Sequence, residues 1–420
     1  MARSKEIVIT GAGVVSPIGI GQEAFWTSLV EGRSGVRKLT VCAAPDLVPF
    51  GAEIIDFDAK KYVRHRKSLK VMSRDIQLAF AAAEMACTQA GHHQKPIDPE
   101  RLGIVFGDDM IACELNELVP AFRDCIADGQ FDYKRWGEAA MAEIFPLWML
   151  KYLPNMPACH IGIAQDARGP NNTLTLGDVS SLSAAAEAMR VIDRGAADGM
   201  IAGGAGSRVQ PTMLFRGGLF ELSRRSDDPA GASRPFDATR DGMVNGEGAA
   251  AFVFEAAEHA QARGATPLAR ALGYCAAFEP AADGHSLQGT AIRHAIRGSL
   301  RNSGLAPADI GCVIAHGVST VRDDQREACA INEVLGDVAV TAPKSCFGHL
   351  GAGCGAVDMA AGLLVLKHRL VPPTLNYRQK DPQCPVRVIH DSPEPLEKTT
   401  VMILSHTQYG QAVALVLAAP

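Results

Sequence analysis

The sequence lacks several features that would assign it to a common class. Its 420 residues contain no run of 18 or more apolar residues, which argues against a membrane-spanning helix. The formal charge of -5 is spread without blocks of one sign, which argues against a nucleic-acid-binding protein. The 11 cysteines are scattered singly, with no C-x-x-C pair, so neither a disulfide framework nor a zinc site is indicated. Small substrates and protein partners remain.

The N-terminus also lacks the apolar core of a signal peptide. Its first six residues lead directly into the strand-like run Ile7-Val8-Ile9, so we expect a cytoplasmic protein. With 47% hydrophobic and 21% charged residues, the chain is long enough for one large core or for two fused halves.

Short apolar runs, mostly bounded by glycine, alternate along the chain with longer Ala-rich stretches of helical period. The runs lie at residues 6–10, 103–107, 199–203 and 312–315. The Ala-rich stretches lie at residues 78–90, 182–194 and 357–367. They carry few charges, which is typical of helices packed between sheets. The alternation predicts an α/β fold with buried strands, divided into residues 1–255 and residues 256–420.

Two other segments invite an interpretation. The stretch from Thr10 to Pro17 follows a strand and is rich in glycine, but it lacks the third glycine of a dinucleotide-binding fingerprint. We interpret it as a structural turn. The stretch from Asp128 to Pro157 contains two tryptophans and three prolines without clear periodicity, and we expect an insertion that caps the core.

Three segments carry candidate chemistry. They are Arg234-Pro-Phe-Asp-Ala-Thr-Arg-Asp-Gly-Met-Val-Asn-Gly-Glu-Gly-Ala249, then Ala315-His-Gly-Val-Ser-Thr320, then Lys344-Ser-Cys-Phe-Gly-His-Leu-Gly-Ala-Gly353. In this order and spacing they resemble the signatures of the β-ketoacyl-acyl-carrier-protein synthases of fatty-acid and polyketide synthesis. Further segments agree, and the resemblance runs in register from about residue 5 to residue 417.

The resemblance implies a fold and a site. The fold would be the thiolase fold, two similar α/β halves in α-β-α-β-α layers, and the protein a homodimer or a heterodimer with a ketosynthase. The site would place two histidines and a cysteine at the end of a pantetheine tunnel. The histidines map to His316 and His349, with Lys344 near the second, and their N–H groups would stabilise an enolate.

The resemblance also implies supporting residues. Asp324 and Glu327 fall at acidic positions where they would orient a loop, a histidine or a water. Histidines that are merely packed and hydrogen-bonded are the alternative. No metal is expected, because no third ligand is spaced for one, and the phosphopantetheine would arrive on the carrier protein.

Asp178 marks one departure from the family pattern. The segment Gly169–Leu182 aligns with the one that carries the family's nucleophilic cysteine, and Asp178 stands where that cysteine should be. A cysteine at a helix N-terminus gains nucleophilicity from the helix dipole, whereas an acyl-aspartate would hydrolyse. An ordinary N-cap role for Asp178 is the alternative.

The acyl gate marks a second departure. The family shows a Phe-Gly-Phe-Gly-Gly-Thr-Asn segment, and the aligned residues here are His406 to Ala412. Of the gate residues Gln408, Tyr409 and Gly410, only the glycine matches, so the gate is absent or changed.

The densest basic segment, Lys60 to Arg74, predicts a surface for an acidic partner. An acyl carrier protein is acidic, and Lys67, Lys70, Arg74 and Arg225 are the residues expected to dock it. A solvated helix face is the alternative for any single lysine.

Three functions remain open. The first is an enzyme that uses the two histidines on a malonyl thioester without an acyl-cysteine, as a decarboxylase or by unusual condensation. The second is a non-catalytic partner like the chain-length factors, and the third is a hydrolase or acyltransferase with Asp178 as general base.

Overall fold

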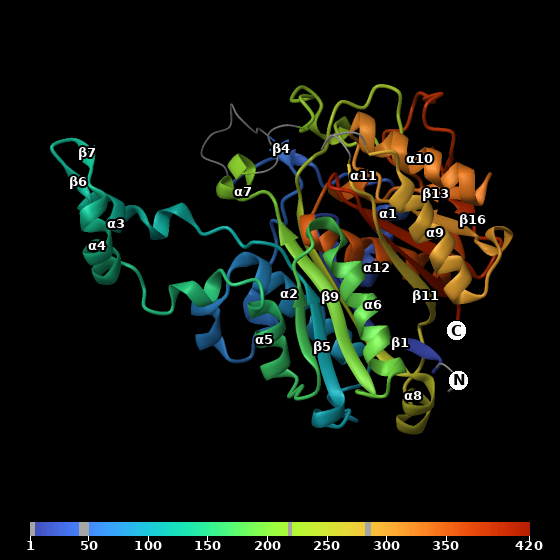
Figure 1. Ribbon diagram of the computed structural model, residues 1–420, viewed down its shortest axis with the longest axis horizontal. Coiled ribbons are helices and arrows are strands. Elements are labelled where there is room, and N and C mark those ends of the chain that lie inside the picture. Colours follow the sequence, from blue (N-terminus) through green and yellow to red (C-terminus); the bar gives the residue numbers. More distant parts are fainter. Residues whose placement is uncertain (1–4, 42–49, 217–220, 282–286) are drawn as a thin grey trace.

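The computed structural model describes residues 5–41, 50–216, 221–281 and 287–420 (Figure 1). The strands are β1 (Ile7–Ser16), β2 (Gly19–Ile20), β3 (Arg37–Lys38), β4 (Phe50–Gly51), β5 (Leu102–Gly107), β6 (Ile126–Ala127), β7 (Gln130–Phe131), β8 (Asn171–Leu174), β9 (Gly199–Ser207), β10 (Glu247–Ala256), β11 (Ala269–Phe278), β12 (Cys312–Ile314), β13 (Ala339–Thr341), β14 (Leu370–Val371), β15 (Arg387–Val388), β16 (Glu394–Pro395), β17 (Thr400–His406) and β18 (Gln411–Ala418). The helices are α1 (Gln22–Val30), α2 (Arg74–Gln89), α3 (Val119–Asp124), α4 (Trp136–Glu143), α5 (Met156–Ala164), α6 (Ser180–Asp193), α7 (Pro211–Arg216), α8 (Ala257–Arg263), α9 (Thr290–Ser303), α10 (Val321–Leu335), α11 (Lys344–Phe347) and α12 (Cys354–His368).

The main sheet repeats one pattern of pairing in two halves. In the N-terminal half the order is β8-β5-β9-β10-β1, with β8, β5 and β9 parallel and the other pairs antiparallel. In the C-terminal half the order is β15-β13-β12-β17-β18-β11, again parallel up to β17 and then antiparallel. A short ladder between β1 and β11 joins the halves through Val8 and Ile9.

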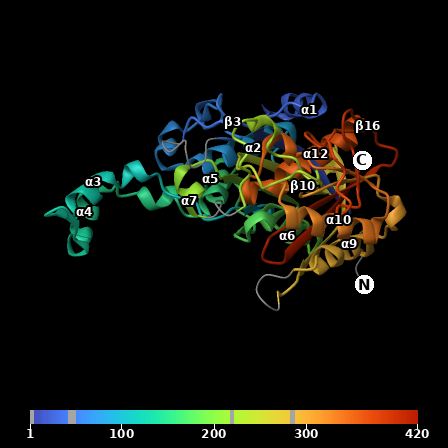
Figure 2. The same ribbon diagram turned by 90° about the horizontal axis from the view of Figure 1, so that it is seen from above.

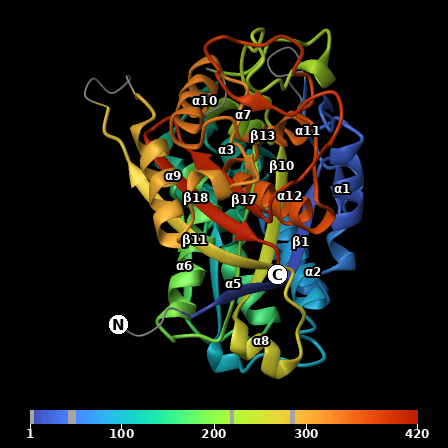
Figure 3. The ribbon, with the colours of Figure 1, turned by 90° about the vertical axis from the view of Figure 1, so that its right-hand side faces the viewer.

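The helices complete five layers. Helices α6 and α12 contact each other, with α6 on β9 and β5 and α12 on β17 and β10. Helix α2 covers β1 and β10 from outside, and α9 covers β11 and β18 (Figure 3). Residues Cys354–Leu366 of α12 are all buried, which its Ala- and Gly-rich sequence allows. The predicted thiolase fold of two α/β halves is confirmed, whereas the boundary at residue 255 stays a prediction.

The glycine-rich stretch after Thr10 is a strand, and our interpretation of it as a turn was wrong. Gly11 and Gly13 lie within β1 and face α2. A Cβ atom at Gly11 would lie 2.1 Å from the carbonyl oxygen of Ala86, and one at Gly13 would lie 2.0 Å from that of Ala82. The glycines therefore let a buried helix approach the strand.

The expected capping insertion, residues 128–157, packs on the core only at its C-terminal end, where Tyr152 and Met156 contact a cluster of buried residues. The segment with α3, β6, β7 and α4 projects away from the two halves as an arm (Figures 1 and 2). A small cluster of Ala121, Cys125 and Ala139 holds it together. Apolar side chains are exposed along it, with Tyr133 83% and Met141 87% exposed. The part of the expected insertion that contains β7 and α4 is therefore an extension rather than a lid.

Among the described residues, no helix combines the length and the apolar character needed to span a bilayer.

Candidate active site

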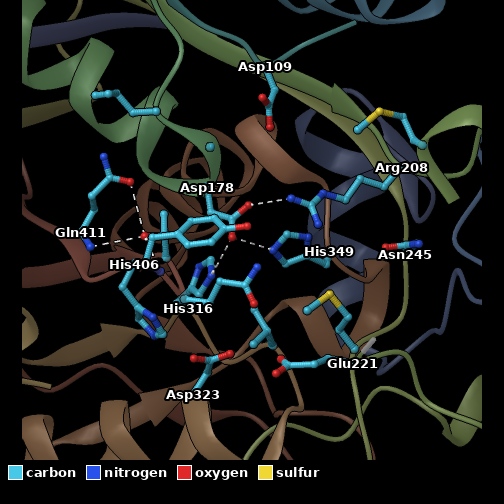
Figure 4. Close-up of a pocket in the computed structure, with 18 of the residues that line it drawn as sticks. Asp109, Asp178, Arg208, Glu221, Asn245, His316, Asp323, His349, His406 and Gln411 are labelled. Atoms are coloured by element: carbon cyan, nitrogen blue, oxygen red, sulfur yellow. Dashed lines mark hydrogen bonds and ion pairs between the residues drawn. The ribbon is translucent and has the colours of Figure 1, made fainter. Parts of the chain in front are cut away.

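A cavity of about 570 Å³ lies where loops of both halves meet. The turn before α6, the loops after β9 and β12, the loop after α11 and the turn between β17 and β18 all contribute to its wall. Asp178, His316 and His349 face it together (Figure 4). The structure thus brings together three residues that lie far apart in the sequence.

Asp178 lies in the short 3-10 turn Gly177–Val179 directly before α6. Its side chain makes no capping hydrogen bond to the helix, so the N-cap alternative is not supported. Instead Oδ1 accepts a hydrogen bond from Arg208 Nη2 at 3.1 Å, and Oδ2 lies 3.2 Å from His349 Nε2. Oδ2 is also 3.9 Å from His316 Nε2. The carboxylate therefore occupies the point on which both imidazoles converge.

His316 lies in a loop held by two buried carboxylates. The carboxylate of Glu327 accepts hydrogen bonds from the backbone N–H groups of His316 and Gly317 at 2.6 and 2.8 Å. Asp324 accepts those of Val318 and Ser319 at 2.9 and 3.0 Å, and its other oxygen accepts Phe236 N–H at 2.8 Å. These bonds fix the loop after β12 and so the direction of the imidazole.

His349 follows α11 and is fixed through its backbone. Its N–H donates to Val244 O at 2.7 Å, and its carbonyl accepts Gly246 N–H at 2.9 Å. Lys344, at the start of α11, is buried and ion-paired with Asp358. The lysine therefore adds charge near Asp178 and His316 without lining the cavity.

The protonation states follow from burial and neighbours. Burial alone would raise the pKa of Asp178, but His349 and Arg208 hold it well below its ordinary value. Burial opposes the charged form of His349, yet Asp178 raises its pKa to about 9. Burial and the Lys344 charge hold the pKa of His316 well below its usual value. At neutral pH the site thus holds an ionised aspartate, a protonated His349 and a neutral His316.

One contact opposes full protonation of His349. The N–H of Gly351 points at its Nδ1 at 3.4 Å, which favours the tautomer with the proton on Nε2, toward Asp178. This contact is long and weak, so the ion pair with Asp178 decides the charge.

Arg208, His406 and Asn245 are among the wall residues that were not predicted as site residues from the sequence. Arg208 directly follows β9, and a charged residue at the end of a buried Gly- and Ala-rich strand is a signal that could have identified it. His406 stacks edge-on to His316 with ring centroids 4.6 Å apart, and its Nε2 lies 3.6 Å from Glu327. Asn245 is 2% exposed and also lines the cavity. Asn245 lies within the motif Arg234–Ala249 and His406 begins the segment aligned with the acyl gate, but neither was singled out as a site residue.

No metal was expected, because no third ligand is spaced for one in the sequence, but the fold brings a third candidate ligand beside the two histidines. Ligand atoms of Asp178, His316 and His349 all lie within 4.8 Å of one another, so the three could hold a divalent cation. Two features favour the ion pair instead. The Gly351 N–H occupies the nitrogen of His349 that a metal-bound imidazole would use to donate a hydrogen bond. Arg208 already forms an ion pair with the carboxylate of Asp178, and its positive charge would repel a divalent cation.

The gate residues form the tight turn between β17 and β18. Gln408 and Tyr409 line the cavity, but the side chain of Tyr409 is 73% exposed and so does not fill it. Gly410 adopts φ 94°, and a Cβ atom there would meet Glu279 O at 2.0 Å. The glycine is therefore required by the turn.

The four residues expected to dock a carrier protein differ in their surroundings. Lys67 and Lys70 are exposed on the 3-10 helix Arg66–Val71. Arg74 forms an ion pair with the buried Glu247 at 2.7 Å. Arg225 lies 3.5 Å from Asp241 and donates to Thr239 O. Lys67 and Lys70 are therefore more available to a protein partner than Arg74 and Arg225.

Comparison with known proteins agrees with the fold. The family model described as "Beta-ketoacyl synthase, N-terminal domain" matches residues 4–260, and its C-terminal counterpart matches residues 268–378. The chain is 33% identical to 3-oxoacyl-[acyl-carrier-protein] synthase 2 of Synechocystis sp., over 90% of each chain. It is also 33% identical to the putative polyketide beta-ketoacyl synthase 1 of Streptomyces halstedii, over 99% of each.

Solved structures give the same result. The ishigamide ketosynthase/chain length factor superposes with a TM-score of 0.88 at 27% identity, covering 100% of both chains. A beta-ketoacyl synthase from Burkholderia phymatum superposes with a TM-score of 0.88 at 28% identity, covering 99% of this chain and 100% of the other. The chain therefore belongs to the β-ketoacyl synthase family.

Proposed function

We propose that the chain is a carrier-dependent, ketosynthase-like enzyme that acts on a malonyl thioester without forming an acyl-enzyme. Asp178 stands, in this proposal, where the family has its nucleophilic cysteine. One observation carries the proposal: Asp178, His316 and His349 share an open cavity. None of the described residues that line this cavity is a cysteine.

The charges of the site suit a malonyl group. An isolated ionised Asp178 would repel the malonyl carboxylate. Arg208 and protonated His349 each add one positive charge, so the three residues together carry one net positive charge. Repulsion by Asp178 is thereby offset.

Decarboxylation would use the histidines as donors. The bond between the methylene carbon and the carboxylate breaks, carbon dioxide leaves, and the electron pair forms the enolate of the thioester. The Nε2–H groups of His316 and His349 stabilise the enolate oxygen once it displaces the Asp178 carboxylate. The enolate carbon then takes up a proton from solvent water, which gives an acetyl thioester and hydroxide that the buffer neutralises.

General-base chemistry by Asp178 is less favoured. Since His349 and Arg208 hold the pKa of its carboxyl well below the ordinary value, it binds a proton weakly at neutral pH. The hydrolase alternative therefore lacks a suitable base.

An acyl carrier protein is the proposed partner. The relatives include acyl-carrier-protein synthases, and a ketosynthase in complex with its acyl-carrier protein superposes with a TM-score of 0.83 at 26% identity. The exposed charges of Lys67 and Lys70 would attract the acidic carrier, which brings its own phosphopantetheine.

The direct test follows malonyl-carrier by mass spectrometry. The wild-type protein is expected to convert it to acetyl-carrier, and His316→Ala is expected to lower the rate by at least about 100-fold because one enolate donor is lost. His390→Ala, at an exposed position, serves as control. Absence of acetyl-carrier in every reaction contradicts the proposal.

A second candidate is a non-catalytic partner of an active ketosynthase. The ishigamide ketosynthase/chain length factor and the exposed apolar arm support it. Stable association with a cysteine-containing ketosynthase, together with no turnover of malonyl-carrier, would favour this candidate over the first.

A further inference from the structure

The turn between β17 and β18 is closed by the hydroxyl group of Thr407. Its oxygen accepts hydrogen bonds from the backbone N–H groups of Tyr409 and Gln411 at 3.2 and 3.3 Å, and the hydroxyl donates to Gln411 Oε1 at 3.3 Å. The hydroxyl thereby uses its one donor and both of its acceptor sites. Backbone bonds close the same turn, from Thr407 N–H to Gln411 O at 2.9 Å and from Gly410 N–H to Thr407 O at 3.3 Å. One side chain therefore links the start, the tip and the end of the turn.

The turn is also anchored to the elements around it. The N–H of Glu279, directly after β11, donates to Gly410 O at 2.8 Å. The carboxylate of Glu279 accepts a hydrogen bond from the N–H of Thr290 at 2.7 Å, which ties this residue to the start of α9. On the other side, the hydroxyl of Ser405 donates to Asp178 O at 2.7 Å. The turn is therefore a fixed wall rather than a moving gate.

This wall separates the cavity from a second hollow. Both spaces are lined by the same three residues, which are His406, Thr407 and Gln411. The second hollow measures only about 10 Å³ and lies against Leu287 and Ile292. Figure 4 shows His406 and Gln411 together on one side of Asp178. A ligand in the cavity thus meets the wall before it can reach the apolar space behind it.

The side chains of the wall are as confined as its backbone. The ring of His406 is 3% exposed, its centroid lies 4.6 Å from that of His316, and its Nε2 lies 3.6 Å from Glu327. A close-packed interior leaves such a ring no space into which it could rotate. The side-chain oxygen of Gln411 is bonded to Thr407. Neither His406 nor Gln411 is therefore free to turn out of the wall.

A fixed wall limits the length of the acyl group that the cavity accepts. An acyl chain that reaches the wall can continue only if the turn opens, and opening breaks the three hydrogen bonds of the Thr407 hydroxyl. Polar groups left unpaired inside a protein are costly, so the closed turn is favoured over the open one. We propose that Thr407 is a specificity-determining residue, which locks the turn and so restricts the substrate to thioesters of short acyl groups.

This inference rests on the proposed function, because it assumes that a thioester enters the cavity, but its test needs no turnover. The probes are amide analogues of acetyl-, butyryl-, hexanoyl- and octanoyl-pantetheine, in which nitrogen replaces the thioester sulfur. They carry no malonyl carboxylate and resist hydrolysis. Isothermal titration calorimetry measures the dissociation constant of each probe. Absence of malonyl-carrier turnover would contradict the proposed function without changing the order of these affinities.

The wild-type protein is expected to prefer the short probes. In an open tunnel each added methylene would tighten binding about 4-fold, because its burial is favourable. The octanoyl probe is instead expected to bind at least about 10-fold more weakly than the butyryl probe, because the longer chain overfills the space in front of the wall.

Two substitutions separate the hydroxyl of Thr407 from the shape of its side chain. Thr407→Val keeps the shape but removes the three hydrogen bonds, and it is expected to bind the octanoyl probe at least as tightly as the butyryl probe. Thr407→Ser keeps the hydroxyl and is the matched control, which is expected to keep the wild-type order. A residue that only fills space would not be replaced by serine without effect. Thr407→Ala takes the place of Thr407→Val if valine prevents folding.

Three results would overturn the proposal. The first is wild-type binding that tightens steadily from the acetyl to the octanoyl probe. The second is no detectable binding of any probe by the wild-type protein. The third is a folded variant without the hydroxyl that keeps the wild-type order of affinities.

Discussion

At the scale of single residues, the length of the Asp178 side chain is decisive. A cysteine ends at its sulfur atom, whereas aspartate extends one atom further and divides into two oxygens. Oδ2 thereby reaches both histidines while Oδ1 reaches Arg208. In the proposed function, an internal carboxylate thus occupies the place that the thioester oxygen of the substrate takes.

Asp75 offers a residue-scale prediction on stability. It is 6% exposed at the start of α2, and burial together with the nearby Glu247 raises its pKa to about 7. The folded protein therefore binds a proton that the unfolded chain, with an ordinary pKa near 4, releases. Stability from this proton is fully present below about pH 4 and is lost as the pH rises toward 7.

Asp75→Asn is consequently expected to stabilise the protein at pH 8, by on the order of 2 kcal/mol, and to have little effect near pH 4. The loss of a negative charge in the first turn of α2 costs only about 0.3–1 kcal/mol. Thermal unfolding of the variant and of the wild-type protein at pH 8 and at pH 4 measures this difference in stability. A lower Tm for the variant at pH 8 would contradict it.

The residues of the site differ in how far the sequence could reveal them. His316, His349 and Lys344 lie in segments whose order and spacing resemble the family's motifs. Arg208 and Asn245 meet the site only because β9 and β10 pair and bring their ends together. Side-chain contacts of that kind depend on strand register, which the sequence pattern does not fix.

At the scale of elements, α2 packs on β1 because the strand has no side chains there. Gly11→Ala is expected to destabilise the protein by about 1–3 kcal/mol, since its Cβ atom would meet the Ala86 carbonyl oxygen and Ala90 Cβ. Denaturant unfolding measures the change.

Gly137→Ala is the matched control for Gly11→Ala. Gly137 lies in α4 with nothing within 4 Å of its added Cβ atom, and alanine favours the helix. Equal stability of Gly11→Ala and the wild-type protein would refute the packing explanation.

The elements themselves were largely predictable. The short apolar runs became β1, β5, β9 and β12, and the Ala-rich stretches became α2, α6 and α12. One error arose because glycine is common both in turns and in closely packed strands. A Gly-rich run after Thr10 suggested a turn, but close packing of a helix requires the same residue inside a strand.

At the scale of the whole molecule, the arm with α3, β6, β7 and α4 projects from the core and exposes apolar side chains to water. Its direction away from the core could not be inferred, because the segment shows no periodicity that a core would impose. Exposed apolar side chains such as Tyr133 and Met141 are costly in water and are typical of protein interfaces. We expect the arm to pack on a second chain.

Sedimentation of the purified protein is expected to give twice the mass of one chain. Met141→Glu combined with Tyr133→Ser is expected to shift the equilibrium toward monomer by placing polar groups in that interface. A wild-type protein that is monomeric both alone and with a ketosynthase, or a dimer that the double variant leaves unchanged, would contradict the role of the arm. A chain that dimerises only with a ketosynthase would support the second candidate function.

The most direct test of the central claim, that Asp178 stands at the nucleophile's position and removes the acyl-enzyme step, is the intact mass of the protein after incubation with acyl-carrier. Asp178→Cys is expected to gain the mass of the acyl group. Its thiol would lie before α6 and beside His349, where a thiolate is stabilised. The wild-type protein is expected to show no added mass. Acylation of the wild-type protein, or no acylation of the folded Asp178→Cys variant, would contradict the claim.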